Sequence, residues 1–416
     1  MARKMKDSGI EWIGKIPEGW SIARGKHILT LLQRAVFPTD GVITCFRDGE
    51  VTLRSNRRED GFTVSLKEIG YQGIEPGDLV VHGMDGFAGS IGISDSRGKS
   101  SPVLVVLDSS QDKKYLMYYL RSMAYNNVFL ALSTGIRVRS CDLKWNKLAD
   151  LLYLVPPIVE QHKLVSFLDE KCSEIDAMLS KTRASIEEYK KLKQAVITQA
   201  VTTLNCPNVK LKYLMDIIVD CPHETPIYTF TGNYLVIRTS DQSLASLRCD
   251  EYMYRLDEAE YKKRTRRLTL DKDDIVYGRE GSWGLACLVP QSNKYCLGQR
   301  VMQFRCNTRL LYPKYAMYAL NSETVYMQGA LDTIGSTAPH VNISTICNYL
   351  LPVPALTEQK EVADYLDAKC AEIDGLIAKK EQLVKELESY KKSLIYEVVT
   401  GKRGIFTDIA RKFPNI

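Results

Sequence analysis

Closely spaced metal ligands and disulfide-forming cysteines are scarce in this sequence. Its eleven cysteines are scattered over 416 residues without one CxxC pair, and it has only five histidines. Structural zinc sites need pairs of cysteine or histidine ligands a few residues apart. The sequence therefore predicts no metal site. An odd number of cysteines without a framework also indicates a reducing compartment, so we expect a cytoplasmic protein.

Long hydrophobic runs are missing as well. The longest nearly apolar stretch, residues 148–159, contains Asp150 and two prolines, and it is shorter than the roughly 20 residues that cross a bilayer. The first seven residues carry several charges and no apolar segment follows them, unlike a secretory signal peptide. We therefore expect no membrane partner.

The motifs of several enzyme classes are absent. The chain has no P-loop for ATP, and Val155 precedes Pro156-Pro157 where an amino-methyltransferase needs an acidic or amide residue. The glycine-rich turn at residues 83–89 runs into another strand-like segment instead of a helix, which makes it a poor cradle for phosphate. The sequence therefore predicts a protein that is not an enzyme and has no cofactor of its own.

The overall composition is that of a globular protein with several domains. Hydrophobic residues make up 45% and charged residues 25% of the chain, and the formal net charge is +6. A chain of this length usually forms two to four domains of roughly 100–200 residues each. The mild basic excess permits binding to nucleic acid without requiring it.

An internal repeat is the strongest signal in the sequence. Residues 155–202 match residues 353–400 at a constant offset of 198 positions and without a gap. Among the repeated pairs, Glu160-Gln161 falls on Glu358-Gln359. Two similar halves in one polypeptide tend to form a pseudo-two-fold object, which can meet a two-fold partner such as the strands of DNA.

Both repeated segments carry a heptad stripe of apolar residues. Steps of four and three alternate along each segment, as they do along the seam of a coiled coil. A single stripe could equally belong to a core-facing helix of a bundle, but two matching stripes favour one antiparallel coiled coil. Residues 160–202 would then form a helix of roughly 64 Å, at about 1.5 Å per residue. The seam residues are Leu168, Ile175, Leu179, Ile186, Leu366, Ile373, Ile377 and Val384.

The stretches between the helices contain short strand-like runs that also correspond. The turn at 83–89 aligns with the turn at 278–284, and a tyrosine-rich helical patch follows each set of runs. We predict an α+β fold with two similar globular domains joined by two long helices. The predicted segments are a first domain at 1–154, a helical spacer at 155–203, a second domain at 204–352, and a second spacer with a tail at 353–416.

Basic and amide residues in the two globular domains are candidates for DNA contact. Phosphates attract positive charge, arginine can grip guanine in two places, and asparagine can grip adenine. Each basic run could instead be solvated surface, and that alternative stays open. The first-domain candidates are Arg54, Asn56, Arg57, Arg58, Arg137 and Arg139. The second-domain candidates are Arg238, Ser240, Lys263, Arg264, Arg279, Ser282, Gln299, Arg300 and His340.

Several of these segments together resemble the specificity subunits of type I restriction–modification systems. The segment 7–20 is similar to the N-terminal signature of that family, and 156–161 and 354–359 are similar to its two helix starts. Arg279-Glu280-Gly281, together with 297–300, is similar to its second target-recognition domain. The first domain departs from this pattern, because Met84-Asp85-Gly86 stands in place of the Arg-Glu-Gly sequence.

The resemblance implies a DNA-reading scaffold without catalysis. In that family each of two target-recognition domains reads one half of a split site on double-stranded DNA, and the coiled coil sets the gap between the halves. Two methyltransferase subunits, which hold S-adenosylmethionine, dock on this frame, and two restriction subunits can join them. The alternatives are a stand-alone pseudo-symmetric DNA-binding regulator and a coiled-coil adaptor that binds only proteins. Inserting one heptad into both helices is expected to lengthen the tolerated gap.

Overall fold

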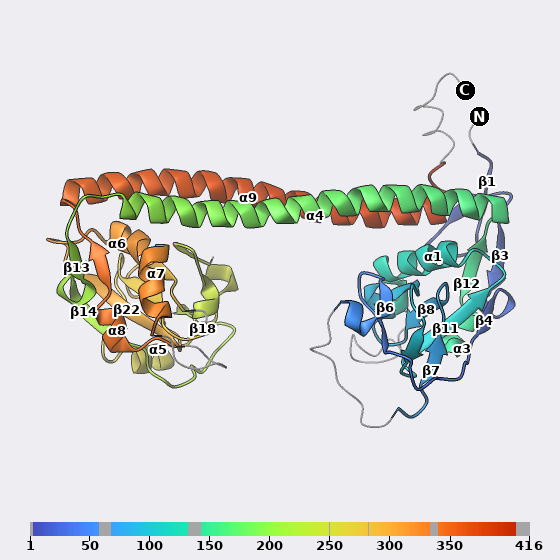
Figure 1. Ribbon diagram of the computed structural model, residues 1–416, viewed down its shortest axis with the longest axis horizontal. Coiled ribbons are helices and arrows are strands. Elements are labelled where there is room, and N and C mark those ends of the chain that lie inside the picture. Colours follow the sequence, from blue (N-terminus) through green and yellow to red (C-terminus); the bar gives the residue numbers. More distant parts are fainter. Residues whose placement is uncertain are drawn as a thin grey trace, which may run out of the picture. The chain divides into compact units, whose positions relative to one another are not determined.

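The chain folds into two compact units, and each contains a globular head and one half of each of two long helices (Figure 1). The computed structural model describes residues 3–57, 68–131, 143–248, 250–281, 283–332 and 340–404. The first unit comprises residues 1–181 and 383–416, and the second comprises residues 182–382. The long helices are α4 (Ile158–Thr202) and α9 (Leu356–Val399). No described helix combines the length and apolarity needed to cross a membrane.

A four-stranded antiparallel sheet forms the centre of the first head. Its strand order is β4 (Leu29–Leu31), β11 (Leu104–Ser109), β8 (Leu79–His82) and β9 (Ile91–Ile93). Two-stranded ribbons surround it: β1 (Met5–Asp7) with β2 (Lys15–Pro17), β3 (Ser21–Arg24) with β12 (Leu152–Val155), β5 (Ile43–Cys45) with β6 (Val51–Leu53), and β7 (Gln72–Ile74) with β10 (Gly98–Ser100). The helices of the head are α1 (Lys113–Tyr125), α2 (Val128–Ala131) and α3 (Trp145–Asp150).

The second head repeats this sheet and adds a smaller one. The repeated order is β14 (Met215–Asp220), β22 (Val301–Cys306), β19 (Ile275–Gly278) and β20 (Ala286–Leu288). The added sheet is β18 (Arg255–Leu256), β15 (Tyr234–Ile237) and β21 (Tyr295–Leu297), and two ribbons pair β13 (Asn208–Lys210) with β23 (Leu350–Pro352) and β16 (Gln242–Ser243) with β17 (Ser246–Leu247). The helices are α5 (Glu258–Arg264), α6 (Pro313–Leu320), α7 (Glu323–Ala330) and α8 (Ile343–Cys347). The α+β prediction is confirmed.

Each central sheet has two buried faces because its strands alternate apolar side chains above and below. In β8, Leu79 and Val81 pack with α1 and the long helices, whereas Val80 packs against the β5–β6 ribbon. All three side chains are fully buried. The far face of the sheet therefore supports the ribbon and, with it, the side chains that follow β6.

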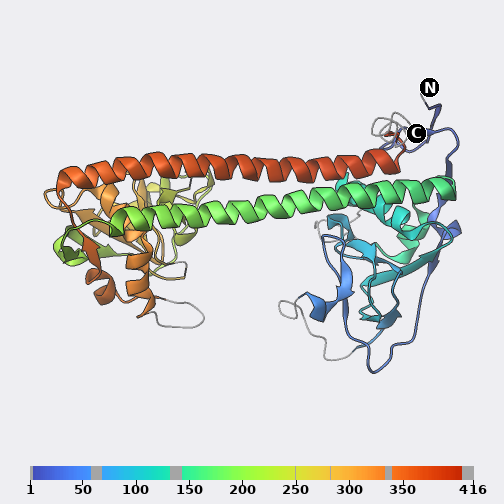
Figure 2. The ribbon, with the colours of Figure 1, turned by 45° about the horizontal axis from the view of Figure 1, so that its top comes forward.

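Within each unit, one half of α4 and one half of α9 lie side by side and run antiparallel (Figure 2). An ion pair between a seam lysine and an aspartate of the other helix occurs once in each unit. Lys193 and Asp374 approach to 2.8 Å in the second unit, and Lys391 and Asp176 to 2.6 Å in the first. Each pair is the other shifted by the 198-residue repeat, so these lysines fix the register of the helix pairing.

The predicted seam residues are buried to different degrees, and some of them also pack into a head: Leu168, Ile175 and Leu179 belong to the apolar core of the first head and Leu366 to that of the second. The buried ones are Leu168, Ile175, Leu179, Ile186, Leu366 and Ile373, and the partly buried ones are Ile377 and Val384. Helix α1 in the first unit and α6 in the second bring tyrosines against this seam: Tyr118 donates to Asp169, and Tyr318 donates to Asp367, each at 2.8 Å. The seam therefore serves both helix pairing and attachment of the heads.

The repeated glutamines explain why the helix starts resemble each other. Gln161 and Gln359 are fully buried, and each side chain joins the start of a long helix to the head. Their hydrogen-bond partners are the carbonyl of Pro156 (2.8 Å) and the N–H of Asp112 (3.0 Å) for the first, and the carbonyl of Pro354 (2.9 Å) and the N–H of Tyr312 (2.7 Å) for the second. A buried amide with such partners is costly to replace.

The N-terminal signature packs against both long helices of the first unit. Trp20 is 1% exposed and donates its indole N–H to Glu160 in α4 at 3.0 Å. The hydroxyl of Tyr396 in α9 donates to the carbonyl of Trp12 at 2.9 Å. The tryptophans of this segment are thus structural anchors.

Candidate nucleic-acid interface

One strand of each central sheet ends in a turn. The structure pairs the residues of these two turns differently from the sequence alignment. Each turn begins with one residue that joins two neighbouring segments through its backbone, Gly83 in the first head and Arg279 in the second. The partners are Val103 (2.8 Å) and Leu143 (2.9 Å) in the first head, and Arg300 (2.8 Å) and Val341 (3.2 Å) in the second. Gly83 therefore occupies the position of Arg279, which corrects the alignment that placed Met84 there. The first turn is one residue longer before the next strand begins.

A polar hollow of about 720 Å³ lies at this end of the first head. It is lined by Thr44, Arg47, Asp48, Arg54, Arg57 and His82, among others. Two of the predicted DNA-contacting residues, Arg54 and Arg57, are thus brought together. Arg54 donates its Nε–H to Thr44 at 3.2 Å, and Asn56 donates its amide to Thr52 at 2.9 Å.

Arg57 is held by carboxylates that a phosphate could replace. Its guanidinium lies 2.6 Å from Asp48 and 3.0 Å from Glu50, and it stacks over the ring of Phe46 at 4.2 Å. The hydrogen bond to Asp48 raises the pKa of Arg57. The three charged side chains are at least 38% exposed, and exposed pairs of this kind contribute only about 0–1 kcal/mol. Exchanging a carboxylate for DNA therefore costs little.

Four of the predicted residues also meet at the equivalent end of the second head. Arg279 and Glu280 donate their backbone N–H groups to the carbonyl of Arg300, and Glu280 forms a β-bridge with His340. Gln299 precedes Arg300 and donates its amide to Thr225 at 3.2 Å. Arg300 is exposed and has a φ of 70°, a backbone conformation that non-glycine residues rarely adopt. Such conformations often occur at binding sites.

The guanidinium of Arg279 is less accessible than the sequence suggested. Its side chain is 9% exposed and pairs with Asp220 and Glu280. Removing one partner of a buried pair is costly. A direct base contact by Arg279 would require one of these carboxylates to release it, whereas Arg300 is already at the surface.

The other predicted residues of the second head divide by burial. Arg264 is 7% exposed and donates to the carbonyls of Leu297 and Glu224, both at 3.0 Å. Arg264 therefore connects β21 to the loop that follows β14. It is not one of the proposed DNA contacts. Lys263 is exposed and pairs with Glu224 at 2.7 Å. Arg238 pairs twice with Asp241 at 2.8 Å.

The remaining candidates are only partly described. Ser240 is exposed, next to Arg238 in sequence. Arg58, Arg137, Arg139 and Ser282 lie outside the described residues.

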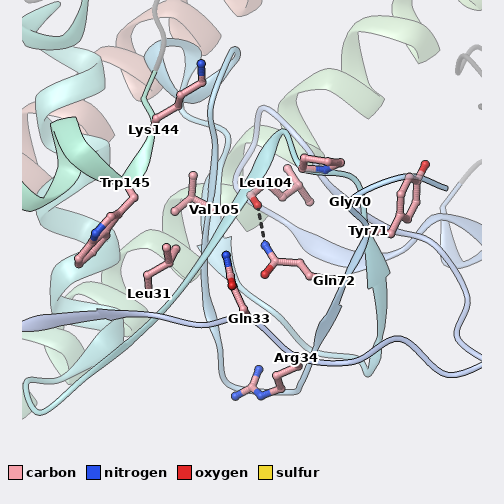
Figure 3. A pocket seen from close by; sticks show the side chains of 11 residues that line it. Leu31, Gln33, Arg34, Gly70, Tyr71, Gln72, Leu104, Val105, Lys144 and Trp145 are labelled. Atoms are coloured by element: carbon pink, nitrogen blue, oxygen red, sulfur yellow. Dashed lines mark hydrogen bonds between the residues drawn. The ribbon is translucent and has the colours of Figure 1, made fainter.

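A second pocket of the first head shares Leu104 in its lining with the polar hollow. It has a volume of about 460 Å³, with Trp145 and Tyr71 at its sides and Gln33 and Gln72 between them (Figure 3). Gln72 donates to the carbonyl of Leu104 at 3.0 Å, which fixes the amide at the base of the pocket. The sequence analysis named none of these residues.

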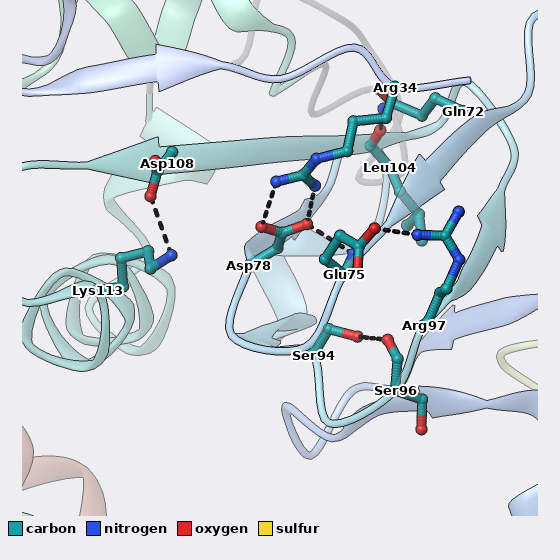
Figure 4. Close-up of polar contacts among 10 residues, drawn as sticks. All are labelled: Arg34, Gln72, Glu75, Asp78, Ser94, Ser96, Arg97, Leu104, Asp108 and Lys113. Carbon is teal, nitrogen blue, oxygen red and sulfur yellow. Dashed lines mark hydrogen bonds and ion pairs between the residues drawn. The ribbon is translucent and has the colours of Figure 1, made fainter. Parts of the chain in front are cut away.

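Two arginines of the first head, Arg34 and Arg97, form ion pairs with buried aspartates. Arg34 forms a two-pronged pair with Asp78 at the start of β8 (Figure 4). Arg97 pairs with Glu75 and with Asp40, the latter at 3.2 Å. Because Asp78 and Asp40 are buried, these contacts hold the loops that precede β8 and β5.

His82 and Arg47 in the hollow were missed by sequence analysis. His82 is the last residue of β8, and Arg47 pairs with Asp85 at 3.1 Å. A polar residue at the end of an otherwise apolar strand was the available signal. Among the described residues no group of three or more His, Cys, Asp or Glu side chains is placed to hold a metal ion.

Comparison with known proteins shows that this chain is similar to specificity subunits. Residues 220–386 match the family model described as type I restriction modification DNA specificity domain. The StySPI specificity subunit of Salmonella potsdam is 22% identical over 432 residues, which cover 94% of this chain and 90% of that protein. The EcoBI specificity subunit of Escherichia coli is 26% identical over 130 residues, but the match spans only 31% of this chain and 27% of that protein.

Solved structures show the same fold at low identity. A chain from a structure titled as the basis of complex assembly and conformational transition of the type I R-M system gives a TM-score of 0.70 at 15% identity, covering 93% of this chain and 99% of the other. The HsdS subunit from Thermoanaerobacter tengcongensis gives a TM-score of 0.50 at 15% identity, covering 95% and 100%.

Proposed function

We propose that this chain, which belongs to the specificity-subunit family of type I restriction–modification systems, reads a split DNA sequence with one head for each half-site. The observation that carries the proposal is that the two heads share one sheet order but differ in side chains at the equivalent turn. Gly83 in the first head stands where the second has Arg279, and His82 stands where the second has Gly278. One scaffold with two different surfaces suits two different half-sites.

Arginine and amide groups supply the proposed contacts. The first head contributes Arg54, Asn56 and Arg57, and the second contributes Arg300 and Gln299, with His340 beside them. Arginines that already rest on exposed carboxylates can exchange them for phosphates, which form stronger charge-assisted hydrogen bonds than neutral groups do. Binding should therefore weaken steeply as salt rises.

The chemistry of the complex is proposed to lie in partner subunits. Two methyltransferase subunits would dock on the frame and supply S-adenosylmethionine, and restriction subunits would join them. The domains at 1–154 and 204–352 would then be the readers, and the helical segments 155–203 and 353–416 the spacer. Antiparallel pairing of α4 and α9 within each unit supports this division.

A head exchange tests the assignment. Residues 20–152 would be replaced by the corresponding segment of a relative with a known half-site, and methylation would be mapped in cells with the methyltransferase subunits. The new motif should keep one half-site and exchange the other. A change in both half-sites would show that the first head does not read independently.

A further inference from the structure

His82 lines the polar hollow in the first head. It is the last residue of β8, its side chain is partly buried, and it lines the hollow together with Arg47, Arg54 and Arg57. Its side chain projects from the same face of β8 as Val80, toward the β5–β6 ribbon. His82 is therefore placed among the arginines proposed to meet DNA.

The backbone of the following turn fixes the ring of His82. Its Nδ1 accepts the N–H of Met84 at 3.2 Å and the N–H of Asp85 at 3.0 Å. A ring nitrogen that accepts two N–H groups carries no proton, so the proton of the neutral ring is on Nε2. The turn thus sets both the orientation of the ring and its tautomer.

The surroundings of His82 favour this neutral ring. Burial lowers its pKa below the usual value, and the positive charge of Arg47 lowers it further, while Asp85 opposes both effects. A second proton would also have to go on Nδ1, which would break the two bonds from the turn. At neutral pH the ring therefore presents one defined hydrogen-bond donor, Nε2–H.

We infer that His82 is a specificity-determining residue of the first head, donating Nε2–H to an acceptor on the edge of a guanine base. This inference rests on the proposed function. Guanine is the base that presents two adjacent acceptors, N7 and O6, in the major groove, whereas cytosine presents an amino donor there. The guanidinium of Arg47 is 60% exposed beside Asp85 and can supply a second donor.

The second head provides an internal control. The strand positions of the two sheets place Gly278 where the first head has His82. Gly278 has no side chain to donate, so any effect of His82 must be confined to one half-site. A general loss of folding or assembly would instead affect both half-sites.

Two conservative variants separate the donor from the fold. His82→Asn keeps an oxygen close to the position of Nδ1, so it can still accept from the turn, but it lacks a group at Nε2. His82→Gln places an amide donor close to Nε2 and loses the acceptor at Nδ1. If His82 were only structural, Asn would preserve function better than Gln. If His82 reads a base, the order is reversed for base discrimination.

The experiment measures binding of the assembled methyltransferase complex to duplexes that carry guanine analogues. Each guanine of the first half-site is replaced in turn by 7-deazaguanine, which lacks N7, or by 2-aminopurine, which lacks O6. At one position we expect a loss of about tenfold for the wild type and for His82→Gln, and less than twofold for His82→Asn. An equal loss in all three proteins, or no sensitive guanine in the half-site, would overturn the inference. If the wild-type complex showed no preference for any split site, the proposed function would fail instead.

Discussion

Adding one heptad to each long helix tests whether the helices set the gap between half-sites. One insertion is placed between Lys181 and Thr182 in α4, and the other between Gln382 and Leu383 in α9. These are the points where one compact unit ends and the other begins. Neither insertion alters the head or the helix contacts within a unit.

The inserted chain should fold because the contacts that fix the register stay within their own units. Lys193 and Asp374 both belong to the second unit, and Lys391 and Asp176 both belong to the first. Seven residues also continue the seam in phase, since a heptad is its repeat. An insertion in only one helix adds seven residues without a partner, so it serves as the mismatched control.

The expected change in the gap follows from helix geometry. Seven residues add about 10 Å of helix at about 1.5 Å per residue, which corresponds to about 3 base pairs at about 3.4 Å each. Three base pairs also rotate one half-site by roughly 100° relative to the other, given about 10.5 base pairs per turn. Three heptads add about 32 Å, or about 9 base pairs, which brings the half-sites nearly back into phase.

Methylation mapping provides the assay. One heptad in both helices should lengthen the gap by about 3 base pairs with weaker methylation, and three heptads should lengthen it by about 9 base pairs with stronger methylation. The insertion in one helix should abolish methylation. A gap that stays the same in the paired insertions, with both half-sites still methylated, would refute the idea that helix length sets the spacing.

Three further predictions concern side chains inside the units. Lys193→Met should destabilise the second unit by about 2 kcal/mol, because the lysine side chain is 8% exposed and its loss leaves Asp374 and the carbonyl of Leu244 without their donor. Lys391→Met should cost less than about 1 kcal/mol, because the side chain of Lys391 is 20% exposed. Hydrogen exchange of each unit measures both costs, and equal costs would contradict the role of burial. Gln359→Leu should cost about 3 kcal/mol by the same method, because it leaves the N–H of Tyr312 and the carbonyls of Pro354 and Leu310 without this partner. A change under about 1 kcal/mol would show that the motif is not an anchor. The pKa of His82 is lower in the folded state than in the unfolded state, so below about pH 6.5 the unfolded state binds more protons. The stability of the first unit should therefore fall as the pH drops through that value. It should fall less in His82→Asn, which has no imidazole to protonate.

The helices and the repeat could be predicted from the sequence because local periodicity determines them. The seam from Leu168 to Ile186 follows steps of four and three, and the structure buries these side chains as expected. Three strands of each central sheet were predictable for a similar reason, since apolar residues run together between glycines, whereas β4 and β14 were not predicted. Both signals depend on neighbours in the chain.

Burial of charged side chains was not predictable from the sequence because it depends on distant segments. Arg264 has the same residue type as Arg300, but Arg264 is buried against backbone carbonyls while Arg300 is exposed. The turn register was hidden by one additional residue in the first head, which shifted Gly83 onto the position of Arg279. His82 was missed because the hollow that surrounds it is lined by residues from distant segments of the sequence.

We propose that this chain selects the DNA sequence that its methyltransferase partner modifies. The most direct measurement is genome-wide adenine methylation in cells carrying the chain with its methyltransferase partner, compared with cells carrying the partner alone. We predict a split motif that appears only when the chain is present. No new methylation, from a complex shown to be assembled, would contradict the claim.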